Sequence, residues 1–393
     1  MIKEQEKSSH QENLVKSRFR RLGEHIQLVD ERNKGLKVKQ LLGLSISKQF
    51  IPSVANIVGT NMENYKIIRK KQFACSTMQV RRDKKMPVAL LRELDEAIIS
   101  QAYPIFEVKD ETKLLPEYLM MWFERSEFDR EACFHAVGGV RGSLEWEDFE
   151  TMQLPIPHID KQREIVKEYN TIQNRIKINE QLIQKLEETA QAIYREWFVD
   201  GIDLENLPEG WEEKSFTEVV KLSGGGTPDT NNVFFWNGEV PFFTPADVAT
   251  GYYSIQTEKT ITDKGLKNSS TKLYPKNTVF VTARGTVGAI SISGCEMAMN
   301  QSCYALKGRY QFFIHQLAIE TMNKLKTEAV GAVFGALVTK DFDAQMVIEP
   351  PIDLQKDFDS IVSNLYEYIL LKTKENQKLA ELKGLLLSRL ATV

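Results

Sequence analysis

The segment Ile165–Trp197, IVKEYNTIQNRIKINEQLIQKLEETAQAIYREW, determines how this chain is organised. Its apolar side chains recur with a strict 4-3-4-3 spacing, which puts them on one narrow stripe of an α-helix, like the a and d positions of a heptad repeat. A stripe this narrow predicts a long helix that packs against a second helix, because a helix that only covered its own domain would need a broader apolar face. The stripe consists of Ile165, Tyr169, Ile172, Ile176, Asn179, Ile183, Leu186, Ala190, Ile193 and Trp197. The polar Asn179 is expected to fix the register of the pair.

A second copy of this pattern lies 193 residues further along the chain. Three stretches match at that spacing without a gap: VGGVRG (137–142) with VGAVFG (330–335), PHIDKQR (157–163) with PPIDLQK (350–356), and QKLEE (184–188) with QKLAE (377–381). The second stripe runs through Phe358, Val362, Leu365 and Ile369, is interrupted by polar residues, and continues at Leu379 and Leu386. The fixed spacing indicates a tandem duplication. The two helices are predicted to pack antiparallel about an approximate two-fold axis.

Each copy begins with a turn-rich region that contains short β-rich runs. Thr278–Thr282 (TVFVT) and Ala289–Ser293 (AISIS) are two such runs, and Ser223–Pro228 (SGGGTP) is a turn signal. The predicted fold class is α+β: two tandem-duplicated mixed α/β domains, joined by two long antiparallel coiled-coil helices with pseudo-two-fold symmetry. The predicted division is a polar tail (1–17), a first mixed domain (18–156), a central helix (157–200), a second mixed domain (201–349) and a C-terminal helix (350–393).

The composition is that of a soluble globular protein, with 42% hydrophobic and 27% charged residues among 393. No apolar run approaches the ~20 residues that cross a bilayer, and the first residues contain no apolar stretch of the signal-peptide type. We therefore expect a cytoplasmic protein without a membrane partner. The four cysteines, Cys75, Cys133, Cys295 and Cys303, form no C-x-x-C pair, which disfavours a zinc site and a disulfide framework. Reduced, mostly buried thiols and no bound metal are expected.

Positive charge is concentrated in one part of the chain, although the net charge is −3. Between Lys66 and Arg92 there are nine Lys or Arg and a single acid, Asp83. A helix of about 40 residues spans roughly 60 Å, so it would hold two related domains at a fixed distance, which suits duplex DNA with its repeat of ~34–36 Å. The cluster is therefore predicted to contact DNA, and a solvated charged edge is the alternative. The residues concerned are Arg69, Lys70, Lys71, Arg81, Arg82, Lys84 and Lys85.

Two positions in the second mixed domain are further candidates for DNA contact. Thr227 belongs to the glycine-rich SGGGTP stretch, whose backbone N–H groups could hold a phosphate. A tight turn at the start of the domain is the alternative interpretation, and the two are compatible. Arg284 follows a predicted strand in a loop flanked by glycine, where its side chain could reach guanine by a bidentate contact.

Aromatic residues divide into predicted core and undecided positions. Trp122 and Phe134 are predicted to lie in the core of the first domain, and Trp146 is predicted to pack beside the hinge that precedes the central helix. Tyr194, Trp197 and Phe198 end that helix, where large aromatic side chains suit either packing on a domain or a partner surface. The sequence leaves these two interpretations open.

Several short motifs follow one another in a fixed order along the two copies: GSLEWEDF (142–149), LPIP (154–157), LEETA (186–190), YREWFV (194–199), LPEGW (207–211), GGTP (225–228), VPFFTPAD (240–247), TARG (282–285) and NQS (300–302). In these motifs the chain resembles the specificity subunit of type I restriction-modification enzymes. The resemblance implies that each mixed domain is a target recognition domain for one half of a bipartite site in double-stranded DNA, with the two helices setting the gap. It also implies two methyltransferase subunits as partners, joined in the full complex by motor-nuclease subunits.

No catalytic role is expected for the chain itself. It contains no Asn/Asp-Pro-Pro-Tyr/Phe motif of an adenine methyltransferase and no Walker A pattern. The resemblance places S-adenosylmethionine, ATP and Mg²⁺ in the partner subunits and no cofactor in this chain. Two alternatives remain: a free-standing bipartite DNA-binding or regulatory protein, and an enzyme with an unrecognised site around the glycine-rich loop.

Overall fold

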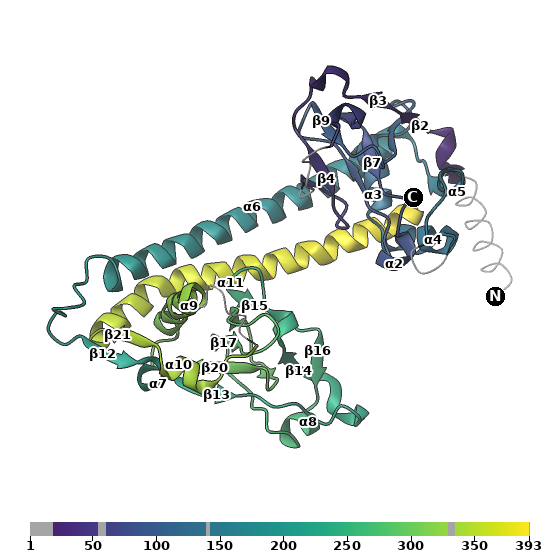
Figure 1. Ribbon diagram of the computed structural model, residues 1–393. Helices are drawn as coiled ribbons and strands as arrows, with labels where there is room; N and C mark the ends of the chain where they lie inside the picture. Colours follow the sequence, from purple (N-terminus) through teal and green to yellow (C-terminus); the bar gives the residue numbers. More distant parts are fainter. Residues whose placement is uncertain (1–18, 54–59, 139–141, 329–334, 393) are drawn as a thin grey trace. The chain divides into compact units, whose positions relative to one another are not determined.

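The computed structural model describes residues 19–53, 60–138, 142–328 and 335–392. These residues form two units (Figure 1). Unit 1 comprises the chain up to Asn174 together with the residues from Ala380 onward, and unit 2 comprises Arg175–Leu379. The predicted polar tail lies outside the described residues, and so do residues 139–141 and 330–334 of the repeated motif.

Unit 1 is built on a four-stranded antiparallel sheet with the strand order β2-β10-β7-β8. Its strands are β2 (Ile26–Val29), β7 (Phe73–Cys75), β8 (Val88–Leu90) and β10 (Ile105–Val108). The remaining strands are β3 (Glu31–Arg32), β6 (Lys66–Arg69) and β9 (Glu96–Ile99) in a second sheet, the hairpin β4 (Leu42–Leu44) and β5 (Phe50–Pro52), and the pair β1 (Phe19–Arg21) and β11 (Gln153–Pro155). Its short helices are η1 (Leu22–Glu24), α2 (Val80–Asp83), α3 (Pro116–Phe123), α4 (Ser126–His135) and α5 (Trp146–Thr151).

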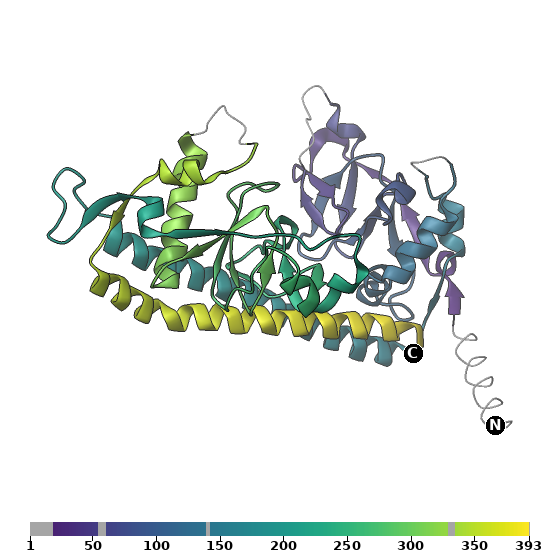
Figure 2. The same cartoon turned by 90° about the horizontal axis from the view of Figure 1, so that it is seen from below.

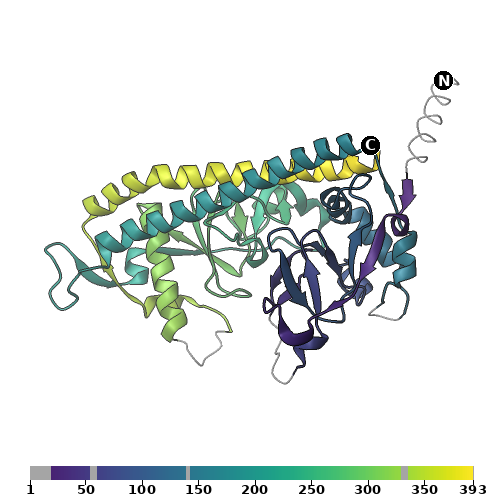
Figure 3. The same cartoon turned by 90° about the horizontal axis from the view of Figure 1, so that it is seen from above.

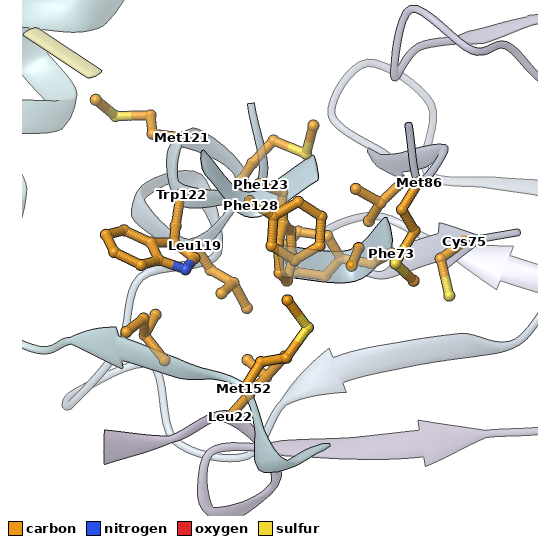
Figure 4. Close-up of a cluster of buried hydrophobic side chains, with 14 of the residues drawn as sticks. Leu22, Phe73, Cys75, Met86, Leu119, Met121, Trp122, Phe123, Phe128 and Met152 are labelled. Atoms are coloured by element: carbon orange, nitrogen blue, oxygen red, sulfur yellow. The ribbon is translucent and has the colours of Figure 1, made fainter. Parts of the chain in front are cut away.

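Aromatic side chains fill the core of unit 1 between the four-stranded sheet and the helices α3 to α5. Phe73 and Phe106 stack with their ring centroids 4.9 Å apart, and Phe123 meets both rings edge-on. Figure 4 shows Phe123 and Phe128 from the helices lying over Phe73 of β7. Strands β7 and β8 are buried along their whole length, which explains why they are uniformly apolar.

Unit 2 is built on a five-stranded sheet with the order β13-β20-β17-β18-β15. Its strands are β13 (Lys221–Gly224), β15 (Tyr253–Ser254), β17 (Val279–Thr282), β18 (Ile290–Ser293) and β20 (Cys303–Lys307). A smaller sheet contains β14 (Trp236–Phe243), β16 (Lys259–Ile261) and β19 (Ala298–Met299), and β12 (Glu212–Ser215) pairs with β21 (Met346–Glu349). The helices are α7 (Phe216–Val219), η4 (Val233–Phe235), α8 (Asp263–Lys267), α9 (Gln311–Glu328) and α10 (Thr339–Asp343).

The two units repeat one topology, which confirms the predicted duplication. The order β2-β10-β7-β8 in unit 1 corresponds to β13-β20-β17-β18 in unit 2, and the pair β1–β11 corresponds to β12–β21. The helices α3 and α4 occupy the place along the chain that the single helix α9 takes in unit 2. Strands β7 and β17, each followed by its hairpin partner, are therefore equivalent, and so are the loops that follow them.

Two long helices, α6 (Ile159–Phe198) and α11 (Ile352–Arg389), contribute to both units and pair antiparallel in each. In unit 2, Arg175 contacts Glu375 at 2.6 Å, while Phe198 packs on Phe358 near the other end of the pair. In unit 1, Lys383 of α11 lies 5.4 Å from the ring of Tyr169 of α6. Within unit 2, Figures 2 and 3 show α9 at a steep angle to the helix pair. The predicted antiparallel packing of the helices is confirmed.

The predicted apolar stripe of α6 is buried or half-buried along its length. Ile165, Tyr169 and Asn179 are buried, and the other predicted positions up to Leu186 are half-buried. The side chain of Asn179 donates a hydrogen bond to Asn376, 2.8 Å away, so the polar break in one helix meets the polar break in the other. In α11, Phe358, Val362 and Ile369 are buried, whereas Leu365, Leu379 and Leu386 are half-buried.

Beyond Leu186 the buried face of α6 moves by one position. Tyr194 and Phe198 are buried, while Ile193 and Trp197 are half-buried. The cause is α9, whose Phe313 packs against Tyr194 and Phe198 in addition to the contacts from α11. The aromatic residues at the end of α6 therefore pack within unit 2, the first of the two interpretations that the sequence left open.

The structure corrects one core prediction. Phe134 is 80% exposed, because α4 buries the face carrying Phe128 and Ala132 instead. Trp122 is buried as predicted, and Trp146 is partly buried against Phe106. Cys75 and Cys303 are buried, and Cys133 and Cys295 are half-buried. Within the described ranges, no helix is long and apolar enough to cross a membrane.

Candidate nucleic-acid interface

Several of the predicted DNA-contact residues lie in topologically equivalent loops of the two units. Arg81, Arg82, Lys84 and Lys85 lie in the loop between β7 and β8, residues 76–87. Arg284 lies in the loop between β17 and β18, residues 283–289, which is the equivalent loop of unit 2. We refer to these as the first and second hairpin loops. Each is thus an exposed connection carried by two buried strands, a position where a side chain is displayed on a rigid support.

The first hairpin loop is tightly folded. Its helix α2 is bounded by Gln79 and Lys84, which both adopt left-handed backbone conformations with φ of 63° and 53°. The loop is closed at its base by a hydrogen bond from Ser76 N to Pro87 O of 2.8 Å, and Leu144 N bonds to Thr77 O at 2.9 Å. These bonds fix the backbone conformation of the loop that carries the exposed cationic side chains.

A buried ion pair supports this loop from below. Lys48, at the turn of the β4–β5 hairpin, contacts Asp129 of α4 at 2.8 Å, and their side chains are 7% and 11% exposed. Asp129 also accepts a hydrogen bond from Met86 N at the end of the loop, and Lys48 donates to the carbonyl of Phe123. Burial lowers the pKa of Lys48, and Asp129 opposes that shift. Sequence reasoning missed the pair, because 81 residues separate its members and neither lies in a recognisable pattern.

The end of β6 and the turn after it carry the other predicted cations, and these are already paired. Arg69 forms ion pairs of 2.7 Å with Glu31 of β3 and with Glu96 of β9. The hydrogen bonds from Arg69 hold the pKa of Glu31 below its ordinary value. Lys71 contacts Glu111 at 2.6 Å, and Lys70 lies 3.7 Å from Asp95. This part of the basic stretch is therefore largely neutralised by carboxylates from elsewhere in the chain.

The cations of the first hairpin loop differ in this respect. Arg82 contacts the neighbouring Asp83 at 2.6 Å. Arg81, Lys84 and Lys85 are exposed and have no carboxylate at ion-pair distance within the described part of the chain. These three side chains are the positive charges of the first hairpin loop that remain available to an anionic partner.

The glycine-rich loop of unit 2 is a packed turn. A Cβ atom at Gly225 would lie 2.1 Å from the carbonyl oxygen of Asn300, and one at Gly226 would lie 2.0 Å from Oγ of Ser270. The N–H of Gly226 is bonded to Met299 O at 3.1 Å and is not free for a phosphate. Thr227 is exposed at the tip of the turn. The glycines therefore serve close packing, while Thr227 remains at the surface.

Thr227 and Arg284 lie on a common rim of unit 2. The hydroxyl of Thr227 donates a hydrogen bond to Gln301 Oε1. The next residue, Ser302, accepts a 2.7 Å hydrogen bond from Ala283 N at the start of the second hairpin loop. Arg284 is exposed there, and Gly285, with φ of 78°, turns the chain over Pro245. The structure thus brings together two residues that lie 57 positions apart in the sequence.

No group of three or more His, Cys, Asp or Glu side chains within the described ranges could hold a metal ion. His315 is buried and hydrogen-bonded to Tyr366, and burial lowers its pKa to about 3, so it is a neutral packing residue near neutral pH. The chemistry that this surface supports is contact with an anionic polymer through exposed cations and hydroxyl groups.

Comparisons with known proteins agree with the duplicated topology. The family model described as the type I restriction modification DNA specificity domain matches residues 53–188 and again residues 208–381. The HindI type I restriction enzyme specificity subunit of Haemophilus influenzae is 23% identical over 374 residues, covering 76% of this chain and 81% of that protein. The MjaIX specificity subunit of Methanocaldococcus jannaschii is 25% identical over 187 residues, covering 46% and 43%. The crystal structure of a type I restriction-modification S subunit from M. genitalium superimposes with a TM-score of 0.59, at 15% identity and 95% coverage of both chains, which is a likeness of fold.

Proposed function

The chain belongs to the family of the type I restriction-modification DNA specificity domain, and we propose that its two units each read one half of a bipartite DNA target for such an enzyme. The observation that carries this proposal is the duplication: the domain occurs twice, and the equivalent hairpin loop exposes several basic residues in unit 1 and one, Arg284, in unit 2. Arg81, Lys84 and Lys85 would contact DNA from unit 1, and Thr227 and Arg284 from unit 2.

We assign the recognition domains to residues 18–156 and 201–349 and the spacers to residues 157–200 and 350–393. The assignment is supported by the bounds of α6 and α11. The spacer helices would meet along the stripe that begins at Ile165 and its counterpart that begins at Phe358. The chain would contribute specificity and no catalytic step, and S-adenosylmethionine, ATP and Mg²⁺ would be bound by other subunits.

The partners we propose are two methyltransferase subunits, with motor-nuclease subunits in the complete enzyme. An apolar groove in unit 1 supports the first of these. It has a volume of about 560 Å³ and lies between α6 and the end of α11, with Ile172 on one side and Leu382 and Leu385 on the other. Leu382 and Leu385 are 50% and 59% exposed, which suits an obligate partner helix better than solvent.

Mapping of adenine methylation in the host genome by long-read sequencing tests this function. Deleting the chain is expected to abolish methylation of one bipartite motif, and Arg284→Ala is expected to relax one half of that motif while the other half is unchanged. Co-purification of the chain with a methyltransferase tests the partner. Methylation that persists after the deletion, or a chain that binds DNA in the cell with no methyltransferase attached, contradicts the proposal and favours a free-standing regulator.

The role of the helices as a spacer has a separate test. Inserting seven residues into α6 after Leu186, with a matching insertion in the facing part of α11, would lengthen each helix by about 10 Å. The expected result is a gap longer by about three base pairs with both half-sites preserved. Altered half-sites at an unchanged gap would contradict the spacer role.

A further inference from the structure

A second basic surface lies in unit 2, outside the hairpin loops. Between positions 259 and 276 the chain contains five lysines and one acid, Asp263. The lysines are Lys259, Lys264, Lys267, Lys272 and Lys276. All five are exposed, and none has a carboxylate at ion-pair distance among the residues that the structure describes. The segment runs from β16 through α8 to the start of β17.

An apolar tip stands beside these lysines. Val233 and Phe234, in the single turn η4, are each 74% exposed. Single exposed apolar residues are common on protein surfaces, whereas adjacent ones rimmed by polar residues are typical of interaction sites. We call this pair, together with the five lysines, the tip surface.

The backbone of the tip is held firmly, so its exposure does not result from a loose loop. The side chain of Asn232 accepts a hydrogen bond from Phe234 N, and the hydroxyl of Thr262 donates to Phe234 O at 2.8 Å. Thr262 N bonds to Phe235 O at 3.0 Å. A Cβ atom at Gly265 of α8 would lie 2.4 Å from that same carbonyl. Helix α8, with Lys264 and Lys267, is thus packed directly against the turn that presents Phe234.

The tip surface is continuous with the rim that carries Thr227 and Arg284. Ser270, which follows α8, is the neighbour of Gly226 in the glycine-rich loop. Thr271 then donates a 2.7 Å hydrogen bond to Met299 O, the same carbonyl that accepts from Gly226 N. From Phe234 to Arg284 the segments that carry these side chains are therefore packed on one another within unit 2, through the buried Gly226, Thr271 and Met299.

We infer that the tip surface is a second contact of unit 2 with the same duplex, in which Lys264, Lys267 and Lys272 neutralise phosphates and Phe234 packs against a base. The inference rests on the proposed function of the chain in DNA recognition. The unpaired cations favour DNA as the partner, because their binding to phosphates releases counterions. The size of the apolar pair disfavours a protein partner, since two exposed side chains fall far short of the ~800 Å² that each partner contributes to a stable protein interface. Apolar side chains flanked by cations insert between base steps in several classes of DNA-binding protein.

The experiment uses the full chain in complex with its methyltransferase. DNA binding is measured with a duplex recovered from a random-sequence library by selection with the wild-type complex, over a series of salt concentrations. Phe234→Ala is expected to weaken binding roughly tenfold, and Phe234→Trp to retain it. The triple variant Lys264→Gln, Lys267→Gln, Lys272→Gln is expected to reduce the slope of log K against log[salt] by about 2 to 3.

Leu204→Ala supplies the control, because Leu204 is 71% exposed in unit 2 and lies outside the tip surface and the hairpin loops, and it is expected to bind DNA like the wild type. Unchanged thermal unfolding of the variants establishes that they fold. If Phe234→Ala binds as the wild type does, or if the triple variant leaves the salt slope unchanged, the inference is wrong. Loss of the methyltransferase with DNA binding retained would assign the tip to a protein partner and also overturn it. A wild-type complex from which no duplex can be selected would instead contradict the proposed function.

Discussion

The basic stretches of the two units differ in what surrounds them. In unit 1 the end of β6 and the turn after it carry Arg69, Lys70 and Lys71, and each has a carboxylate partner from another part of the chain. In unit 2 the lysines between positions 259 and 276 have no such partner within the described residues. The number of basic residues in a segment therefore does not measure the positive charge that it offers to a ligand.

Strand pairing explains the difference between Arg69 and Lys259. Arg69 lies directly opposite Glu96 in the β6–β9 ladder, where opposite charges stabilise each other. Lys259 in β16 lies opposite Phe242 of β14, which offers no carboxylate. The partner of a charged residue is set by the strand register, so two stretches of similar composition can differ in their free charge.

The largest effect is expected from removing the support of the first hairpin loop. Asp129→Ala leaves Lys48 buried without its partner and Met86 N without its acceptor, which should lower the free energy of unfolding by about 3–5 kcal/mol. Chemical denaturation of the full chain measures this. Asp95→Ala, which removes a carboxylate from an exposed pair, is the control and should change stability by less than about 0.5 kcal/mol. Similar losses for the two variants would show that the buried pair does not support the loop.

The next effect separates free from paired cations within unit 1. Replacing Arg81, Lys84 and Lys85 by glutamine should weaken binding to a mixed-sequence duplex by about 30- to 100-fold and reduce the salt slope by about 3. The same replacement at Arg69, Lys70 and Lys71 should weaken binding by less than about threefold, because the carboxylates already neutralise those cations. Fluorescence anisotropy over a salt series provides both quantities. Equal losses for the two triple variants would make the comparison between free and paired charge untenable.

A smaller gain is expected when the paired cation is released. The double variant Glu31→Gln, Glu96→Gln removes both partners of Arg69 and should strengthen binding to a mixed-sequence duplex by about threefold, with the salt slope larger by about 1. The measurement is the same anisotropy titration. The single variant Glu63→Gln, at an exposed acid that makes no contact with Arg69, is the control. A double variant that binds no better than Glu63→Gln would mean that Arg69 does not reach DNA even when it is free.

The smallest effect concerns pH. Arg69 lowers the pKa of Glu31 below its ordinary value, so the stabilisation from this pair is fully present above the unfolded pKa of the carboxyl and is lost only as the pH falls through the lowered folded value. At pH values down to about 4.3, the ordinary pKa of a glutamate, the ratio of DNA affinities of the wild type and the Glu31→Gln variant should therefore stay close to its value at neutral pH. Anisotropy at several pH values checks this. A ratio that has moved about halfway to one at about pH 4.3 would mean that the pair does not depress that pKa.

Periodic features of the sequence predicted the fold well. The heptad stripe from Ile165 and the repeat at 193 residues are readable without knowledge of any contact, and they led to the antiparallel helices and the duplicated topology. The exposure of Phe134 was not predictable in this way, because α4 carries aromatic residues on two faces and only the position of its neighbours decides which face is buried.

The candidate site was predictable only in part. The exposed cations of the first hairpin loop and Arg284 were found from local composition, but their equivalence emerged from the strand order. The carboxylate partners of Arg69 come from strands that lie 38 and 27 residues away, and no local sequence pattern indicates them. The exposed tip at Phe234 was not predictable from the sequence, because its exposure depends on hydrogen bonds from Thr262.

The composition of unit 1 has a consequence for the way the chain folds during synthesis. Leu387 and Leu390 are buried in the same core as Ile165 and Tyr169, so that core stays incomplete until residues up to Leu390 have been translated. At roughly 5–20 residues per second, the ribosome needs about 10–40 s to make the intervening segment. Throughout that interval the nascent unit 1 carries an uncovered apolar face, whereas unit 2 is made from one uninterrupted stretch of chain. The half that is translated first is therefore the half that completes its core last.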